Sequence, residues 1–536
     1  MSVRPARASR HMARAFELAR AVRGTTSPNP AVGAVIAHGS RIVGEGSTQP
    51  PGMPHAEVMA LRQAGDQASG ATMYVTLEPC AHVGRTPPCT EAIIETGIDR
   101  VVVAVGDPDR RVSGRGLAQL RDAGVEVSLG DGAALGADHY EAYAHHRRTG
   151  RPFVTAKFAA SLDGRIASTS GDSRWISGPQ TLVWAHRNRP LFDAILVGVE
   201  TIIVDNPQLT ARPEDWRGPI PQPLRVVLDS RGRTPLDSRV LQGTDQSHTL
   251  ITTTDTADVD WRTSIAQGGV DIAVLPADAE RGGRVSLPAV LELLGQVHGV
   301  VSLLVEGGGE VLGSFFDQRL INKVTAVVAP MIIGGDAQAA VRGGGAERMR
   351  DVLRLNRMTT ERLGSDLLIT GYPVDPEREL QVRVRPAGPD DEEDIDLLIA
   401  SHLGAQAPGA EELLAAARLG EAVVWVAVAP AGGIETGTVP AGGEEVLGVA
   451  AIAVGGEAAD SRLAAIICLA IQADAPQSAA DRLRESCEAS AAGREAEWLT
   501  CTLDQAPGLS DEQLKLVGYR YYRRNLETGD VLIKRL

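Results

Sequence analysis

Long apolar segments and an excess of positive charge are both missing from this chain of 536 residues. No run of about 18 apolar residues occurs, so we expect no membrane-spanning helix. Acidic residues number 68 against 53 Lys and Arg, and the formal net charge of −15 argues against a protein that coats nucleic acid. The N-terminal segment lacks the apolar core and cleavage site of a secretory signal, so we expect a cytoplasmic protein.

Cysteine is also scarce, since five residues in so long a chain exclude a disulfide scaffold. Cys80 and Cys89 lie close together in the sequence and are candidate metal ligands. Cys468, Cys487 and Cys501 are expected to be buried apolar residues. No internal repeat of fixed period is visible.

The length suggests about three domains at roughly 100–200 residues each, and an apolar content of 43% allows each domain a core. Strand and helix patterns alternate over residues 1–150, which predicts an α/β domain that includes a hairpin at 34–46 and a helix at 55–65. The alternation restarts after Pro152 and predicts a second α/β domain over 151–375. Residues 376–536 carry exposed Ala-, Gly- and Glu-rich loops and form a third section.

The first domain contains four residues in the pattern of a zinc-water site. His55 lies in Pro-His-Ala-Glu at the start of the predicted helix, and Cys80 and Cys89 follow in EPCAHVGRTPPC. One imidazole and two thiolates suit tetrahedral zinc and leave the fourth position for water, whose pKa zinc lowers to about 7. Glu57 lies two residues after His55, where it can shuttle protons without binding the metal.

Other interpretations of this segment remain open. His82 could close a purely structural zinc site as a fourth ligand, or the two thiols could simply be buried. Arg85 is predicted to receive a substrate phosphate, against the alternative of a solvated loop charge. Asn29, held between two prolines, could bind the edge of a purine- or pyrimidine-like ring, or could only form a turn.

The second domain has no G-x-G-x-x-G segment after a strand, so the usual dinucleotide fingerprint is absent. Instead the predicted strand VSLLVE enters Gly307-Gly308-Gly309 and then a helix. Such a turn lets a phosphate approach backbone N–H groups at a helix start, although glycines there often only cap the helix. Lys157 is predicted on a strand, followed by a polar turn at 161–165.

The segments TSPNPAVG, PHAE and EPCAHVGRTPPC, in this order and spacing, resemble the bacterial bifunctional riboflavin-biosynthesis deaminase–reductases over roughly residues 8–372. The resemblance implies a cytidine-deaminase-like domain followed by a dihydrofolate-reductase-like domain, with zinc and NADPH as cofactors. The first would hydrolyse the 2-amino group of 2,5-diamino-6-ribosylamino-4(3H)-pyrimidinone 5′-phosphate. The second would reduce the ribosyl group of the product to a ribityl chain. The resemblance also implies a homo-oligomer.

The resemblance assigns roles to residues that match its motifs. Metal ligands are His55, Cys80 and Cys89, and the proton carrier is Glu57. Cofactor contacts are Ala159, Trp175, Thr201, Asp205, Ser230, Gly308, Gly309, Glu310, Val311, Leu312, Gly313 and Ser314. Contacts to the reductase substrate are Ser173, Arg189, Leu209, Arg212 and Glu306, and contacts to the deaminase substrate are Asn29, His82 and Arg85.

Some of these assignments also have a chemical basis. Arg189 and Arg212 suit a phosphate, because guanidinium binds it bidentately. Lys157 and Asp205 are predicted to be the polar groups nearest the reacting carbon. The alternatives are an exposed strand-edge position for Lys157, a core position for Trp175 and a simple turn for Asp205.

Residues of about 380–536 resemble the GNAT-type acetyltransferases in their strand and helix order. The loop expected to hold the pyrophosphate, Gln477–Arg482, lacks its glycines, and Asp481 adds a repulsive charge. We therefore favour a degenerate module over an active acetyl-CoA-dependent acyltransferase.

For the whole chain, the main alternative keeps one catalytic half active and the other as a scaffold. A binding protein without catalysis would make two reactive constellations accidental.

Overall fold

The computed structural model describes residues 8–374 apart from 83–86, 110–111 and 350, and from 383 onward mainly a set of strands with short helical pieces. These residues divide into two compact units. One combines 1–22, 31–140 and 375–536, and the other combines 23–30 and 141–374. In the described part of the chain, no helix is long and apolar enough to cross a membrane.

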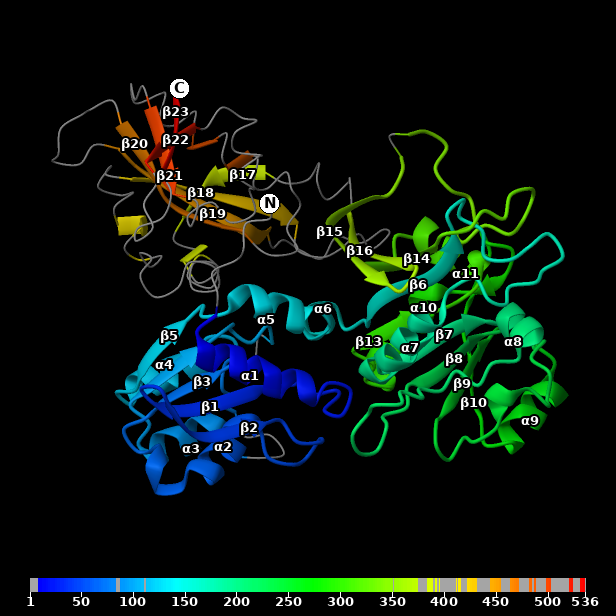
Figure 1. The fold of residues 1–536 in the computed structure, drawn as a ribbon, viewed down its shortest axis with the longest axis horizontal. Coiled ribbons are helices and arrows are strands. Elements are labelled where there is room, and N and C mark those ends of the chain that lie inside the picture. The colour runs from blue at the N-terminus through cyan, green and yellow to red at the C-terminus, as the bar shows by residue number, and fades with distance from the viewer. Residues whose placement is uncertain are drawn as a thin grey trace. The chain divides into compact units, whose positions relative to one another are not determined.

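The first sheet has five strands in the order β2-β1-β3-β4-β5, with antiparallel pairing up to β3 and parallel pairing beyond it (Figure 1). The predicted hairpin at 34–46 is confirmed as β1 and β2. The strands are β1 (Gly33–His38), β2 (Arg41–Ser47), β3 (Thr72–Val75), β4 (Arg100–Val103) and β5 (Glu126–Leu129). The helices are α1 (Arg10–Ala21), α2 (Ala56–Ala64), α3 (Cys89–Thr96), α4 (Arg115–Asp122) and α5 (Ala133–His139).

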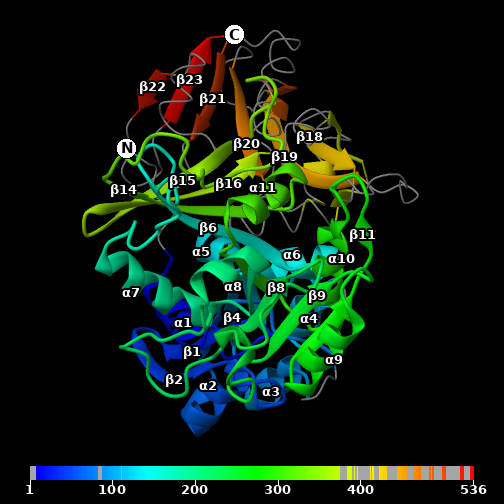
Figure 2. The same cartoon turned by 90° about the vertical axis from the view of Figure 1, so that its right-hand side faces the viewer.

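The second sheet has nine strands in the order β10-β9-β8-β7-β13-β6-β14-β16-β15. The strands from β10 to β14 are parallel, whereas β16 and β15 are antiparallel additions at one edge (Figure 2). Its strands are β6 (Phe153–Ser161), β7 (Ala194–Gly198), β8 (Leu224–Leu228), β9 (Thr249–Thr253), β10 (Asp271–Val274), β13 (Ser302–Val305), β14 (Lys323–Ala329), β15 (Arg354–Leu363) and β16 (Asp366–Val374). A separate pair is β11 (Ala277–Asp278) with β12 (Arg284–Val285), and the helices are α6 (Glu141–Thr149), α7 (Pro179–Asn188), α8 (Val199–Asp205), α9 (Val259–Gln267), α10 (Leu287–Glu292) and α11 (Gly309–Asp317).

The core of the second sheet lies where its parallel strands are covered by helices. Leu196 of β7 and Leu303 of β13 are fully buried, and Leu312 and Phe315 of α11 pack in the same apolar cluster. Parallel strands covered on both faces read as continuous apolar runs, which explains why β7 and β13 could be predicted from sequence. The mixed α/β class predicted for both halves is confirmed.

A third sheet has seven strands in the order β17-β18-β19-β20-β21-β23-β22. The strands are β17 (Arg383–Pro386), β18 (Ala422–Pro430), β19 (Glu444–Val454), β20 (Leu463–Ile471), β21 (Trp498–Thr502), β22 (Arg520–Arg523) and β23 (Val531–Arg535). Cys487 is buried as expected. Residues 477–481 of the predicted pyrophosphate loop lie outside the described residues, and the GNAT-like fold and the boundaries 1–150, 151–375 and 376–536 stay predictions.

Candidate active sites

The first site forms where two helix starts and one loop meet beside the first sheet. His55 is the residue before the first turn of α2, Cys80 lies in the loop after β3, and Cys89 is the first residue of α3. The His55 Nδ1 atom lies 3.3 Å from Cys89 Sγ and 3.7 Å from Cys80 Sγ. The three donor atoms lie within 4.8 Å of one another, and the described residues contain no other such group of possible metal ligands.

These donors fit zinc by their chemistry, because one imidazole and two thiols offer soft and borderline ligands in the tetrahedral set that zinc prefers. Hydrogen bonds from Cys89 and His55 hold the pKa of the Cys80 thiol down to about 4, against the opposing effect of burial. Cys80 is therefore ready to bind a cation as a thiolate. His82 is exposed and is not part of the cluster, so it supplies no fourth ligand among the described residues.

Glu57 lies in the first turn of α2 and is only 4% exposed. Burial, together with the negative charge of Cys80, raises the pKa of its carboxyl to about 7. A bound cation would lower this pKa again. A carboxyl that can both take up and release a proton near neutral pH is the group that general acid–base catalysis needs.

Glu78 anchors the loop that carries Cys80, a role that the sequence did not suggest. Its buried carboxylate accepts hydrogen bonds from the backbone N–H groups of Asp107, Gly114, Gly116 and Leu117 at 2.9–3.3 Å. Three of these donors lie at the start of α4, where helical N–H groups have no partner within the helix. Glu78 thereby fixes Cys80 two residues later. In the sequence, the only indication of this role is that a Glu precedes Pro79.

The remaining residues predicted for the deaminase substrate are only partly placed. Arg85 lies outside the described residues. Asn29 closes a turn in which its N–H donates to the Thr26 carbonyl, and it belongs to the unit formed with 141–374. The turn interpretation is thus satisfied, and contact of Asn29 with a substrate stays a prediction.

The second site lies at the carboxyl edge of the parallel strands, the usual place for ligands in open α/β sheets. Thr201 lies in α8 directly after β7, Ser230 follows β8, and Gly308 follows β13. Lys157 and Ala159 belong to β6, which pairs with β13 and β14 in the middle of the sheet. The sequence alone could not place these residues at one edge, because they come from four separate strands.

Glu306 binds two cations at this edge. One carboxylate oxygen lies 2.7 Å from Arg189 Nη2 and the other lies 3.7 Å from Lys157 Nζ. Burial alone would raise the pKa of Glu306, but Arg189 and Lys157 lower it to about 2. The prediction of an exposed strand-edge Lys157 is therefore wrong, since its side chain is 16% exposed and paired.

His186 was missed by the sequence analysis and lies in the same cluster. It precedes Arg189 by one turn of α7, and its Nδ1 atom is buried without a hydrogen-bond partner, as is the Arg189 Nε atom. Burial, together with the charges of Arg189 and Arg212, lowers the pKa of His186 to about 4. Buried donors and acceptors without partners are rare in native proteins, so both nitrogens are available to an anionic or hydroxylated ligand.

The glycines after β13 are required for different structural reasons, which the space around each of them shows. A Cβ on Gly309 would lie 2.5 Å from the Ala339 carbonyl oxygen, and one on Gly313 would lie 1.9 Å from the carbonyl oxygen of Arg342. At Gly308, the residue before α11, the nearest such atom is Thr201 Oγ1 at 3.8 Å. Only Gly308 therefore offers open space at the helix start, which fits a cofactor phosphate.

The other predicted reductase residues surround this edge in varied settings. Trp175 is 70% exposed, so a core position is wrong. Arg212 donates to Gln208 and Thr210, and Arg189 also donates to the Thr210 carbonyl. Asp205 ends α8, and its carbonyl accepts a hydrogen bond from Arg174. Ser173 lies in an irregular segment, and Leu209 is buried with a left-handed backbone conformation. The remaining predicted residues all belong to the helix α11: Glu310, Val311, Leu312 and Ser314.

Comparison with known proteins finds two family models along the chain. Residues 5–105 match the cytidine and deoxycytidylate deaminase zinc-binding region, and residues 152–369 match the RibD C-terminal domain. These segments contain the cluster around His55 and the cluster around Glu306, respectively.

Similar whole proteins cover both halves together. The riboflavin biosynthesis protein RibD of Bacillus amyloliquefaciens is 40% identical over 367 residues, which are 68% of this chain and 96% of the relative. The corresponding protein of Escherichia coli K12 is 37% identical over 67% of this chain and 97% of its own length. A structure of Acinetobacter baumannii RibD matches with a TM-score of 0.62 and 36% identity over 68% of this chain and 98% of that one.

Proposed function

The chain belongs to the RibD family of bifunctional riboflavin-biosynthesis deaminase–reductases, and from this premise we propose which of its residues carry each reaction. It is a zinc-dependent deaminase of 2,5-diamino-6-ribosylamino-4(3H)-pyrimidinone 5′-phosphate. It is also an NADPH-dependent reductase of the ribosyl group in the deaminated product. The observation that carries the first activity is the cluster of His55, Cys80 and Cys89 with Glu57 buried beside it.

For the deaminase, we propose that His55, Cys80 and Cys89 hold the zinc ion. Bound zinc supplies a water molecule that loses its proton near neutral pH. With zinc bound, the carboxylate of Glu57 would take the proton of that water and deliver it to the ring amine. The remaining hydroxide would bond to the ring carbon as the C–N bond breaks and ammonia leaves. Support comes from the burial of Glu57, which keeps bulk water from competing for the proton. The predicted contacts of Asn29, His82 and Arg85 to the substrate belong to the same proposal.

For the reductase, we propose that NADPH lies along the carboxyl edge of the second sheet with its diphosphate at Gly308. The cofactor supplies the hydride when bound. Lys157, held by Glu306, is the polar group beside the reacting carbon, and Arg189 and Arg212 bind the substrate phosphate. Arg189 and Lys157 pair with the single buried carboxylate of Glu306, and Arg212 lies close enough to Arg189 for their charges to repel. The cluster therefore has an excess of positive charge, which a phosphate dianion would balance.

Position 57 offers the sharpest test of the deaminase. Glu57→Gln should keep zinc near one per chain while ammonia release falls roughly 100- to 10,000-fold, the usual contribution of a general acid–base. Cys89→Ala is the matched control and should lose both zinc and ammonia release. Undiminished ammonia release by the Gln variant would remove Glu57 from the mechanism.

Mass spectrometry of the products tests whether both halves are active. Without NADPH, the diaminopyrimidine phosphate should yield only the deaminated compound, and NADPH should then convert that compound to its ribityl form. A chain that deaminates but never reduces, with its fold intact, would favour the alternative in which one half is a scaffold.

We also propose a degenerate GNAT-like module for residues 376–536. The support is that strands β17 to β21 lie in segments that the resemblance predicted as strands, together with the missing glycines and the added Asp481 in the loop. Titration with acetyl-CoA should give no heat, and binding would instead indicate an acyltransferase. A homo-oligomer is proposed from the family resemblance alone, and sedimentation would test it. A cytoplasmic location is proposed as well, and cell fractionation would test it.

A further inference from the structure

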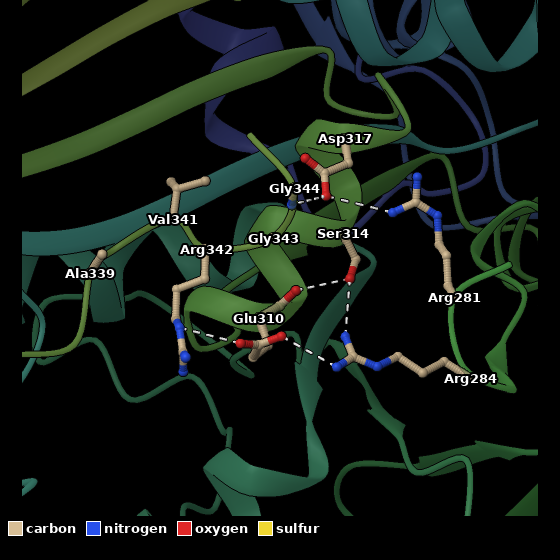
Figure 3. A pocket seen from close by; sticks show the side chains of 10 residues that line it. All are labelled: Arg281, Arg284, Glu310, Ser314, Asp317, Ala339, Val341, Arg342, Gly343 and Gly344. Carbon is tan, nitrogen blue, oxygen red and sulfur yellow. Dashed lines mark hydrogen bonds and ion pairs between the residues drawn. The ribbon is translucent and has the colours of Figure 1, made fainter. Parts of the chain in front are cut away.

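A cavity of about 600 Å³ lies beside α11 in the reductase half. Figure 3 shows three arginine side chains reaching it from two sides, with Glu310, Ser314 and Asp317 of α11 between them. Arg281 and Arg284 come from the β11–β12 pair and its turn, and Arg342 comes from the segment after β14. The cavity therefore gathers guanidinium groups from two separate parts of the chain around one helix.

The ion pairs in this cavity are weak enough to be replaced by a ligand. Arg284 Nη2 lies 3.3 Å from one oxygen of Glu310, and Arg342 Nε lies 3.2 Å from the other. All three side chains are more than 40% exposed, and exposed pairs of this kind contribute little to stability. Arg281 lies 3.6 Å from Asp317. A phosphate monoester, which carries a charge of about −1.5 to −2 at neutral pH, would bind such guanidiniums more strongly than an exposed carboxylate does.

Arg284 connects this cavity with the residues predicted to bind the cofactor. The N–H of Val285 donates to the Ser230 hydroxyl at 2.9 Å, so Arg284 lies next to the residue that follows β8. On its other side, Arg284 Nη1 lies 3.5 Å from the hydroxyl of Ser314 in α11. A dinucleotide whose diphosphate meets the start of α11 would bring the ribose of its adenosine to the space between Ser230 and Ser314.

We propose that Arg284, assisted by Arg281 and Arg342, binds the phosphate on the 2′ oxygen of the adenosine ribose and so makes this reductase select NADPH over NADH. The inference rests on the proposed function, because it requires the cofactor to bind at α11. In dinucleotide-binding enzymes, an Arg guanidinium that binds the 2′-phosphate is a general way to select NADPH over NADH. NADH lacks that phosphate and leaves the ion pairs of the cavity as they are.

Arg231 and Arg233 provide the comparison that the proposal needs. Arg231 is exposed and adjoins Ser230 in sequence, so it is the competing partner for the same phosphate. Arg233 lies three residues after Ser230 in the sequence and is paired with Glu200 at 2.6 Å. Substitution of each by Gln removes one positive charge from the same region.

The test is calorimetric titration of the full chain with NADP⁺ and with NAD⁺, so that no turnover is involved. Arg284→Gln should raise the Kd for NADP⁺ roughly tenfold to a hundredfold, the range for losing a hydrogen bond to a charged group, and leave the Kd for NAD⁺ unchanged. Arg233→Gln should change neither. The exposed position of Arg284 makes loss of folding unexpected, and thermal unfolding of each variant checks it.

Three results would overturn the proposal. Equal weakening of both dinucleotides by Arg284→Gln would place Arg284 at a part that they share, and no weakening of NADP⁺ would remove it from the site. Loss of NADP⁺ selectivity in Arg231→Gln alone would assign the phosphate to Arg231. A wild-type chain that binds neither dinucleotide and does not oxidise NADPH with the deaminated pyrimidine would refute the proposed reductase function itself, which the other results leave intact.

Discussion

Glu306 is the carboxylate on which the charge balance of the reductase cluster depends. Glu306→Gln leaves Arg189 and Lys157 half-buried without a counter-charge, so we expect the reductase half to lose roughly 3 kcal/mol of stability, as when one partner of a buried ion pair is removed. Urea unfolding measures this loss. Glu200→Gln, which breaks the exposed pair with Arg233, is the control and should cost less than about 1 kcal/mol.

The same substitution has a signature in acid. Because the pKa of Glu306 is lowered to about 2, its contribution is complete above the ordinary carboxyl range and is lost as the pH falls toward 2. Glu306→Gln should lack this part of the loss of stability in acid. An identical acid dependence in both proteins would show that Glu306 is not held as an ion pair.

His186 should have its effect at milder pH. Its pKa is lowered to about 4, so between pH 6.5 and 4 the unfolded chain binds a proton that the folded protein does not. Stability should therefore fall as the pH falls through this window, and His186→Gln should make the fall shallower. Thermal unfolding at pH 7 and at pH 5 measures the difference, with substitution of the exposed His38 as the control. A parallel fall in wild type and variant would contradict the assignment.

Residue types decide how much of each site could be predicted. His and Cys are scarce in this chain, with 11 and 5 residues. Their specific spacing, with one Glu beside the His, is why the zinc cluster could be predicted from the sequence. A lone His in a helix carries no such signal, and His186 gains meaning only when the fold brings it beside Arg189 and Arg212. Glu78 was missed for the same reason, because its partners at the start of α4 are distant in sequence.

At the scale of an element, the glycines at α11 have two different roles. Gly313 is needed for close packing, whereas Gly308 faces open space that a ligand can use. Gly313→Ala would force a methyl group against the Arg342 carbonyl oxygen, now 1.9 Å from the ideal Cβ position, so we expect a loss of roughly 1–3 kcal/mol in stability. Gly308→Ala should fold normally but bind NADP⁺ roughly tenfold more weakly, a change of about 1.4 kcal/mol. Thermal unfolding and calorimetric titration measure the two effects. Equal effects of both substitutions on stability would contradict this division of roles.

Elements were predictable where burial imposes a pattern. The strands β7 and β13 are fully buried and read as apolar runs. The helix α9 and the strand β15 were missed, because α9 buries only Ile265 and nearly all of β15 is exposed or half-exposed at the sheet edge. Because neither segment buries a continuous apolar face, neither has a periodic pattern of apolar residues that sequence analysis could detect.

At the scale of the whole molecule, each chemistry has a sheet of its own. The proposed zinc ligands lie at two helix starts and in one loop beside the five-stranded sheet, whereas the residues proposed for NADPH and substrate come from the edge of the nine-stranded sheet. Each site is built from residues of a single sheet and its helices, which is why sequence segments predicted the two sites independently.

The third sheet leads to the last prediction. Relatives such as the Bacillus amyloliquefaciens protein match over 96% of their length while covering 68% of this chain, and the second family model ends at residue 369. Members of the family therefore lack a counterpart of about a third of this chain. A chain that ends at Pro376 should therefore keep zinc near one per chain, ammonia release and NADPH oxidation with unchanged kcat and KM. Zinc analysis and both assays on the shortened and full chains measure this. If one activity fell while the shortened chain still unfolded cooperatively and held its zinc, the tail would be a working part of that active site, because loss of folding could no longer explain the effect.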